Sequence, residues 1–128
     1  MPDGLTALVA FHNARFQENI QEILTRREYT ISTATDIAQF GALCAQRNYD
    51  LYVMDVNLGH PSESVFDAAL DLYQRIQMGV KVGSILFYPC SASYDVVNDA
   101  KHRGLPCLSK EDMLDQLRLI PIPAREKT

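Results

Sequence analysis

Several features that would place the chain in a specialised class are missing from its sequence. None of its apolar runs approaches the roughly 20 residues that a membrane-spanning helix requires. The N-terminal segment also lacks the basic and then apolar pattern of a secretory signal. Basic residues are scattered and the net charge is −4, whereas binding of nucleic acid typically requires a concentrated basic face. We therefore expect a cytoplasmic protein that binds neither membranes nor nucleic acid directly.

Common catalytic and cofactor motifs are missing as well. The sequence has no GxGxxG, no glycine-rich phosphate loop, and no serine, histidine and aspartate at a spacing typical of hydrolases. Its three cysteines show no CxxC spacing, which favours reduced, buried thiols over a disulfide framework or a zinc site. We expect a protein that is not an enzyme and holds no cofactor, although a fold class by itself excludes neither.

What the sequence does contain is an alternation of two hydrophobic periods. Its 128 residues suit one domain, and 47% of them are hydrophobic, as in globular proteins. Apolar runs of strand length alternate with segments of helical period. The pattern predicts strands near residues 6–11, 29–34, 51–54, 82–88 and 106–108, and helices near residues 16–24, 37–44, 66–76, 93–103 and 111–119. The domain is expected to span residues 1–119, with a polar tail over residues 120–128.

Single residues mark where these elements begin and end. Asn13 and Asp36 stand where helix-capping side chains are expected. Gly79 is expected to break the third helix, and Pro89 to end the fourth strand. Gly104 stands just past the fourth helix, in the position that glycine favours after a helix.

Five successive strand–helix units predict an α/β fold, a three-layer sandwich with a parallel sheet between helices. In such sheets functional groups gather at the carboxyl ends of the strands, near the switch in strand order. That edge receives Asp55 from the third strand and Lys110 from the segment after the fifth. The remaining residues expected to line a pocket there are Phe11, His12, Pro89 and Cys90, with Ser91 beside them.

The segment YDLYVMDVNLG, residues 49–59, resembles the phospho-acceptor region of response-regulator receiver domains, which serve two-component (phosphorelay) signalling. The resemblance extends over about residues 5–119. It implies a flavodoxin-like fold with five parallel strands in the order 2-1-3-4-5. It also implies roles for three residues, with Asp55 as phospho-acceptor, Lys110 as a contact of the phosphoryl group, and Asn57 as a carbonyl ligand of a metal ion.

The metal site of the family is poorly preserved. Phe11 and His12 stand where the family has two adjacent acids that hold Mg²⁺, so one carboxylate remains where three would converge. Mg²⁺ prefers hard oxygen ligands in octahedral array. Asp55, Asn57 and His12 are therefore weak metal candidates, and Mg²⁺ is disfavoured. An alternative is a softer transition metal held by His12, Asp55 and Cys90.

Other contacts of the phosphoryl group are altered too. Counting back from Gly104 places Pro89 where the family has a threonine or serine, although Ser91 or Tyr88 would supply a hydroxyl if the turn is shifted. The position of the aromatic switch residue falls near Cys107.

Together these departures favour a degenerate receiver, or pseudo-receiver, that acts through protein–protein interaction without a phosphorylation cycle. Lys110 and a protonated His12 would then compensate the charge of Asp55 permanently, unless His12 only packs or caps the strand end. The alternative is a functional receiver that a histidine kinase phosphorylates on Asp55, with an atypical metal site. The expected partner is a histidine kinase, an output domain, another signalling protein or a second copy of the chain.

Overall fold

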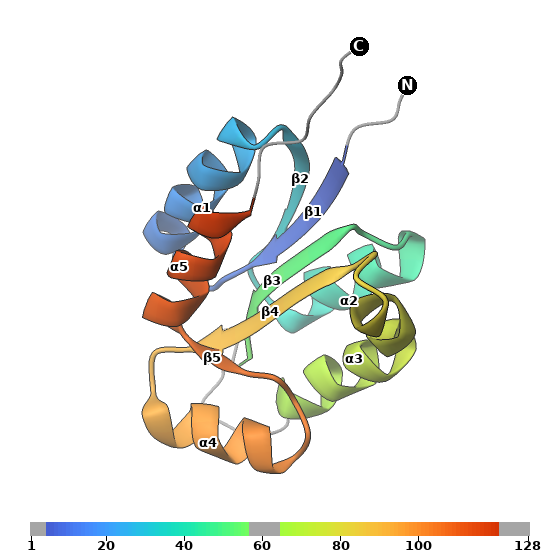
Figure 1. The fold of residues 1–128 in the computed structure, drawn as a ribbon, viewed down its shortest axis with the longest axis vertical. Coiled ribbons are helices and arrows are strands. Elements are labelled where there is room, and N and C mark those ends of the chain that lie inside the picture. Colours follow the sequence, from blue (N-terminus) through green and yellow to red (C-terminus); the bar gives the residue numbers. More distant parts are fainter. Residues whose placement is uncertain (1–4, 57–64, 121–128) are drawn as a thin grey trace.

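The computed structural model describes residues 5–56 and 65–120, and in these residues strands and helices alternate. The elements are β1 (Leu5–Ala10), α1 (Ala14–Arg26), β2 (Tyr29–Ala34), α2 (Ile37–Gln46), β3 (Leu51–Asp55), α3 (Val65–Lys81), β4 (Leu86–Ser91), α4 (Tyr94–His102), β5 (Leu108–Ser109) and α5 (Lys110–Leu119). All strand pairs are parallel, in the order β2-β1-β3-β4-β5 (Figure 1). The flavodoxin-like fold and the strand order are both confirmed.

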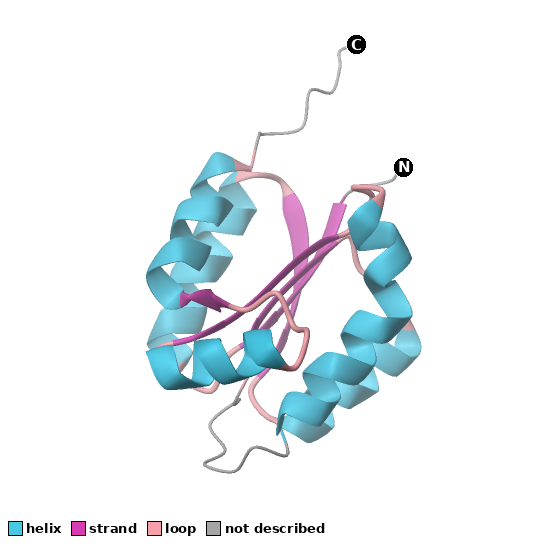
Figure 2. Ribbon diagram, turned by 60° about the horizontal axis from the view of Figure 1, so that its bottom comes forward, coloured by secondary structure: helices cyan, strands magenta, loops and turns pink. Residues whose placement is uncertain are grey.

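Helices cover both faces of the sheet, which gives three layers (Figure 2). Helices α1 and α5 lie side by side on one face, whereas α2, α3 and α4 cover the other (Figure 1). The strands supply alternate residues to the two resulting cores. In β3, Leu51 and Val53 pack on the side of α1 and α5, and Tyr52 and Met54 pack on the opposite side. This burial on both faces explains the continuous apolar run of β3.

The predicted helix caps form as expected. The side chain of Asn13 accepts a hydrogen bond of 2.9 Å from the backbone N–H of Phe16, and Asp36 accepts one of 2.8 Å from Gln39. Gly104 follows α4 with a φ of +91°, a left-handed conformation that residues with a Cβ rarely adopt. All three cysteines are free and buried, as predicted.

Gly79 does not break the third helix, and that prediction was wrong. Helix α3 continues through it to Lys81, because a glycine within a helix costs only about 1 kcal/mol relative to alanine. Its role is steric instead. A Cβ on Gly79 would lie 2.5 Å from Cδ1 of Ile85, so the glycine permits close approach of the chain that enters β4.

Pro89 does not end the fourth strand, which was also predicted wrongly. Strand β4 begins at Leu86, not near residue 82 as predicted, and runs to Ser91, with Pro89 paired to Met54 inside it. The N–H of Leu86 and the C=O of Cys90 bond toward β3, so the intervening Pro89 faces the other edge by alternation. On that edge β5 pairs only with Cys90 and Ser91, and the missing N–H of proline breaks no ladder bond.

The remaining differences lie near the C-terminus. Strand β5 covers Leu108–Ser109 rather than residues 106–108, and α5 begins at Lys110. Ile120, the first residue of the predicted tail, is buried against the core formed with α1 and α5. Asn57, the loop of residues 59–64 and residues 121–128 lie outside the described residues. In the described part of the chain, no helix combines the length and the apolar character needed to cross a membrane.

Candidate functional site

The structure brings Asp55 and Lys110 together at the carboxyl edge of the sheet. Asp55 is the last residue of β3, and Lys110 is the first residue of α5, whose N-terminus is capped by Ser109. The ammonium Nζ of Lys110 lies 3.9 Å from Oδ2 of Asp55. The two side chains are 24% and 17% exposed, respectively. The pair is therefore largely shielded from water, which strengthens the attraction between its charges.

Two aromatic rings lie close to the ammonium group of Lys110. Its Nζ lies 4.5 Å from the ring centre of Phe16 and 5.9 Å from that of Phe11. The rings contact each other edge to face, with centres 5.0 Å apart. A cation at these distances is attracted to the negative face of a ring. Among the described residues, the ammonium group is thus contacted by the carboxylate of Asp55 and by these two phenyl rings.

Phe11 is fixed in place by Gln17, a residue that the sequence analysis did not single out. Gln17 belongs to α1 and is only 7% exposed. Its Oε1 accepts a hydrogen bond of 2.9 Å from the backbone N–H of Phe11, which also donates to the carbonyl of Ala34 at 3.2 Å. Phe16 was likewise missed as a site residue. A signal existed for both, since Asn13 caps α1 and its first turn must lie beside the end of β1.

Ser91 lies at the end of the neighbouring strand. Asp55 pairs with Cys90, which places Ser91 one residue beyond that pair. Ser91 is 3% exposed, and its Oγ accepts a hydrogen bond of 3.1 Å from the N–H of Ser93. Counting back from Gly104 had assigned the family's hydroxyl position to Pro89, with Ser91 or Tyr88 as the alternative, and in the structure Pro89 pairs with Met54 inside β4 while Ser91 is the last residue of the strand. A hydroxyl therefore remains at the end of β4.

Three of the four residues expected to line a pocket are buried. Phe11 and Cys90 are fully inaccessible to solvent, and Pro89 is buried inside β4, whereas His12 is exposed. Burial raises the pKa of the Cys90 thiol, and the neighbouring charge of Asp55 raises it further, while Lys110 lowers it.

The donor set around Asp55 does not fit Mg²⁺. A phenyl ring stands in place of one family acid, and the ammonium of Lys110 lies within 4 Å of the remaining carboxylate. Within residues 5–56 and 65–120, no three histidine, cysteine or acidic side chains lie close enough together to hold a metal ion. Since Mg²⁺ requires several oxygen ligands, these residues by themselves form no Mg²⁺ site.

Comparison with solved structures identifies the fold. A response regulator from Burkholderia pseudomallei, with a phosphorylated aspartic acid, a calcium ion and citrate, superposes with a TM-score of 0.67 and 19% identity, over 90% of this chain and 67% of that one. A receiver domain from Clostridium thermocellum gives 0.63 and 13%, over 89% and 94%. The receiver domain of an HD domain-containing protein from Pseudomonas fluorescens Pf-5 gives 0.62 and 22%, over 90% of each chain.

Comparisons based on sequence give no match. No protein-family model matches the chain, and no curated protein matches it. The similarity to solved structures extends over about nine-tenths of the chain, and it agrees with the five-stranded parallel sheet of order β2-β1-β3-β4-β5. The chain therefore has the fold of response-regulator receiver domains.

Proposed function

We propose that this chain is a receiver-like domain of a two-component signalling system that acts by binding a protein partner, without a phosphorylation cycle. The replacement of the family's two metal-binding acids by Phe11, which is buried, and His12, which is exposed, carries the proposal. The ion pair between Asp55 and Lys110 lies beside Phe11, and there the lysine partly compensates the charge of the acceptor carboxylate. A divalent metal is the main electrostatic stabiliser of phosphoryl transfer, so its loss would lower the rate by orders of magnitude.

The aromatic rings support the same proposal. In water an ammonium group is strongly hydrated, but Lys110 here rests on Phe16 and Phe11 at the edge of the sheet. The rings replace part of that hydration and leave the carboxylate of Asp55 as the charged partner at 3.9 Å. In such a site the carboxylate of Asp55 is paired with the ammonium group of Lys110 at all times. A metal-dependent receiver, in contrast, changes its charge when it is phosphorylated.

A functional phospho-acceptor remains the second candidate, and two observations favour it. Ser91 keeps a hydroxyl at the end of β4, one residue past the partner of Asp55. Asp55 also keeps 17% of its side chain exposed. Under this alternative, a histidine kinase phosphorylates Asp55 with the help of an atypical metal site that includes Asn57.

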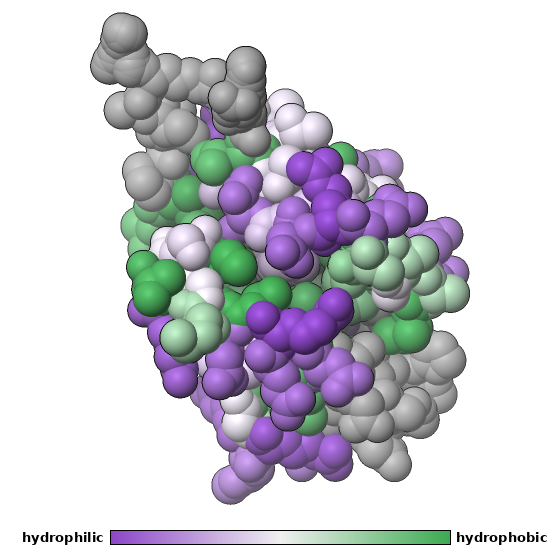
Figure 3. Space-filling model, turned by 90° about the vertical axis from the view of Figure 1, so that its right-hand side faces the viewer, coloured by the Kyte–Doolittle hydropathy of each residue, from purple (hydrophilic) through white to green (hydrophobic). Residues whose placement is uncertain are grey.

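The partner is a kinase, an output domain, another signalling protein or a second copy of the chain, in a cytoplasmic setting. By analogy with receivers, the face of α4, β5 and α5 is the surface to test first. Tyr94 is 68% exposed there, and its hydroxyl lies 3.5 Å from Oε1 of Glu111. On the side that carries α2 and α3, apolar groups are interspersed with hydrophilic ones (Figure 3).

The decisive experiment records amide NMR spectra during addition of Mg²⁺ and then of beryllofluoride, a mimic of the phosphoryl group on aspartate. The proposal predicts unchanged spectra for the wild type and for Asp55→Asn at millimolar Mg²⁺. Saturable shifts at Asp55, Ser91 and Lys110 that vanish in Asp55→Asn would instead establish the phospho-acceptor. A known active receiver, treated in parallel, checks that the reagent is competent.

A further inference from the structure

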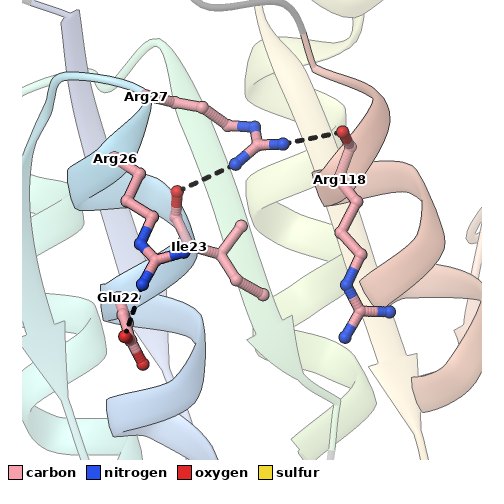
Figure 4. Close-up of a pocket in the computed structure, with 5 residues that line it drawn as sticks. All are labelled: Glu22, Ile23, Arg26, Arg27 and Arg118. Carbon is pink, nitrogen blue, oxygen red and sulfur yellow. Dashed lines mark hydrogen bonds and ion pairs between the residues drawn. The ribbon is translucent and has the colours of Figure 1, made fainter.

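A polar cavity lies between the C-terminal ends of α1 and α5, at the opposite end of the sheet from Asp55. Its volume is about 380 Å³, and five residues line it: Glu22, Ile23, Arg26, Arg27 and Arg118 (Figure 4). Four of them come from α1 or its C-cap, and Arg118 comes from the last turn of α5. Three guanidinium groups thus gather around one small cavity on a chain whose net charge is −4.

Arg27 is held firmly in this cavity. Its Nε donates to the carbonyl of Ile120 at 3.0 Å, its Nη1 to that of Ile23 at 3.2 Å, and its Nη2 to that of Arg118 at 2.7 Å. These carbonyls belong to the C-terminal ends of α1 and α5, where the helix dipole places partial negative charge that would repel an anion. The guanidinium group of Arg27 offsets this partial negative charge. A guanidinium has five N–H groups, so two remain beyond these three bonds.

The other two arginines are positioned loosely. Arg26 pairs with Glu22 at 3.0 Å, and Arg118 pairs with Asp115 at 3.6 Å. All four of these side chains are at least 60% exposed, and exposed pairs of this kind contribute at most about 1 kcal/mol. Both guanidinium groups are therefore able to turn toward a ligand at little cost. With one carboxylate among the lining residues, the lining keeps a net charge of +2.

We infer that this cavity binds a doubly charged oxyanion, namely a phosphate monoester. One preorganised guanidinium and two adjustable ones offer the paired N–H donors that phosphate oxygens accept bidentately. The apolar side chain of Ile23 forms part of the wall and suits the organic portion of an ester. The cavity lies at the opposite end of the sheet from Asp55, and Asp55 is not among its lining residues.

The test uses the whole chain and follows the arginine Nε–H signals and backbone amides by NMR. Inorganic phosphate and a short phosphoserine peptide are added separately, with ionic strength held constant by sodium chloride. We expect saturable shifts centred on Arg26, Arg27 and Arg118. The double variant Arg26→Gln/Arg118→Gln should bind at least tenfold more weakly.

A matched control removes the same charge elsewhere. In Arg15→Gln/Arg103→Gln both arginines lie outside the cavity, and Arg103 pairs with Asp99 one turn earlier, as Arg26 does with Glu22. This control should bind like the wild type. Tighter binding of the phosphoserine peptide than of inorganic phosphate would assign the ligand to a phosphorylated protein, and equal binding would show that the cavity recognises the phosphoryl group alone, as a site for a small phosphate ester does. Shifts that never saturate, or equal weakening in both double variants, would overturn the inference.

Discussion

Replacing Asp55 by asparagine and Lys110 by methionine, singly and together, measures how strongly the two charges are coupled. At 3.9 Å and an effective dielectric constant of about 20, the Coulomb attraction is about 4 kcal/mol. Two effects reduce the net value. The separation exceeds the 2.7–3.2 Å of a direct hydrogen bond, and both groups lose part of their hydration when the chain folds.

We therefore expect a coupling free energy of about 1 kcal/mol, at the upper end of the range for exposed pairs. It is obtained from the free energies of unfolding of the wild type, the two single variants and the double variant, measured in urea at pH 7. Because the side chains are only 24% and 17% exposed, most of the coupling should persist in 0.5 M salt.

The exposed pair of Arg26 and Glu22 provides the control cycle. These side chains are 74% and 65% exposed, so their coupling should be about 0.3 kcal/mol and should vanish in salt. If the Asp55–Lys110 coupling equals that of the control, the lysine does not compensate the carboxylate in any useful sense. The proposal of a permanently neutralised site would then lose its main support.

Three further predictions concern two glycines, the arginines at the end of α1, and the thiol of Cys107. Gly79→Ala should destabilise the fold by about 1 kcal/mol, because a Cβ there would lie 2.5 Å from Cδ1 of Ile85. Gly41→Ala, where a Cβ would have nothing within 4 Å, should stabilise α2 by about 0.5–1 kcal/mol. The midpoints of urea unfolding measure both changes. Arg27→Ala should lower the free energy of unfolding by about 2 kcal/mol, because it removes three hydrogen bonds to helix-end carbonyls. Arg26→Ala should lower it by less than about 0.5 kcal/mol, because it removes only an exposed ion pair. Burial raises the pKa of the Cys107 thiol to about 11, so this thiol ionises at lower pH in the unfolded chain than in the folded one. The free energy of unfolding should therefore fall as the pH rises from 9 to 11, and Cys107→Ala should make that fall less steep. An unchanged slope in Cys107→Ala would show that this thiol does not cause the fall.

Features that depend on neighbours along the chain were predictable from the sequence. The caps at Asn13 and Asp36 require only an acceptor three residues before a backbone N–H. The range of β2 and the left-handed Gly104 follow from equally local preferences. Asp55 and Lys110 were predicted to share an edge because parallel strands all end there. The strand order came from the resemblance to receiver domains.

Features that depend on contacts between distant segments required the tertiary structure. Pro89 is tolerated within β4 because its missing N–H faces an edge where β5 pairs only with later residues, and a list of residues does not show that edge. Phe16 meets Lys110 although 94 positions separate them in the sequence, and Arg27 joins α1 to the end of α5. Hydrophobic periodicity reveals which face of an element is buried. Which partners meet across that face is decided only when the elements pack, because packing depends on the shapes and separations of all of them at once.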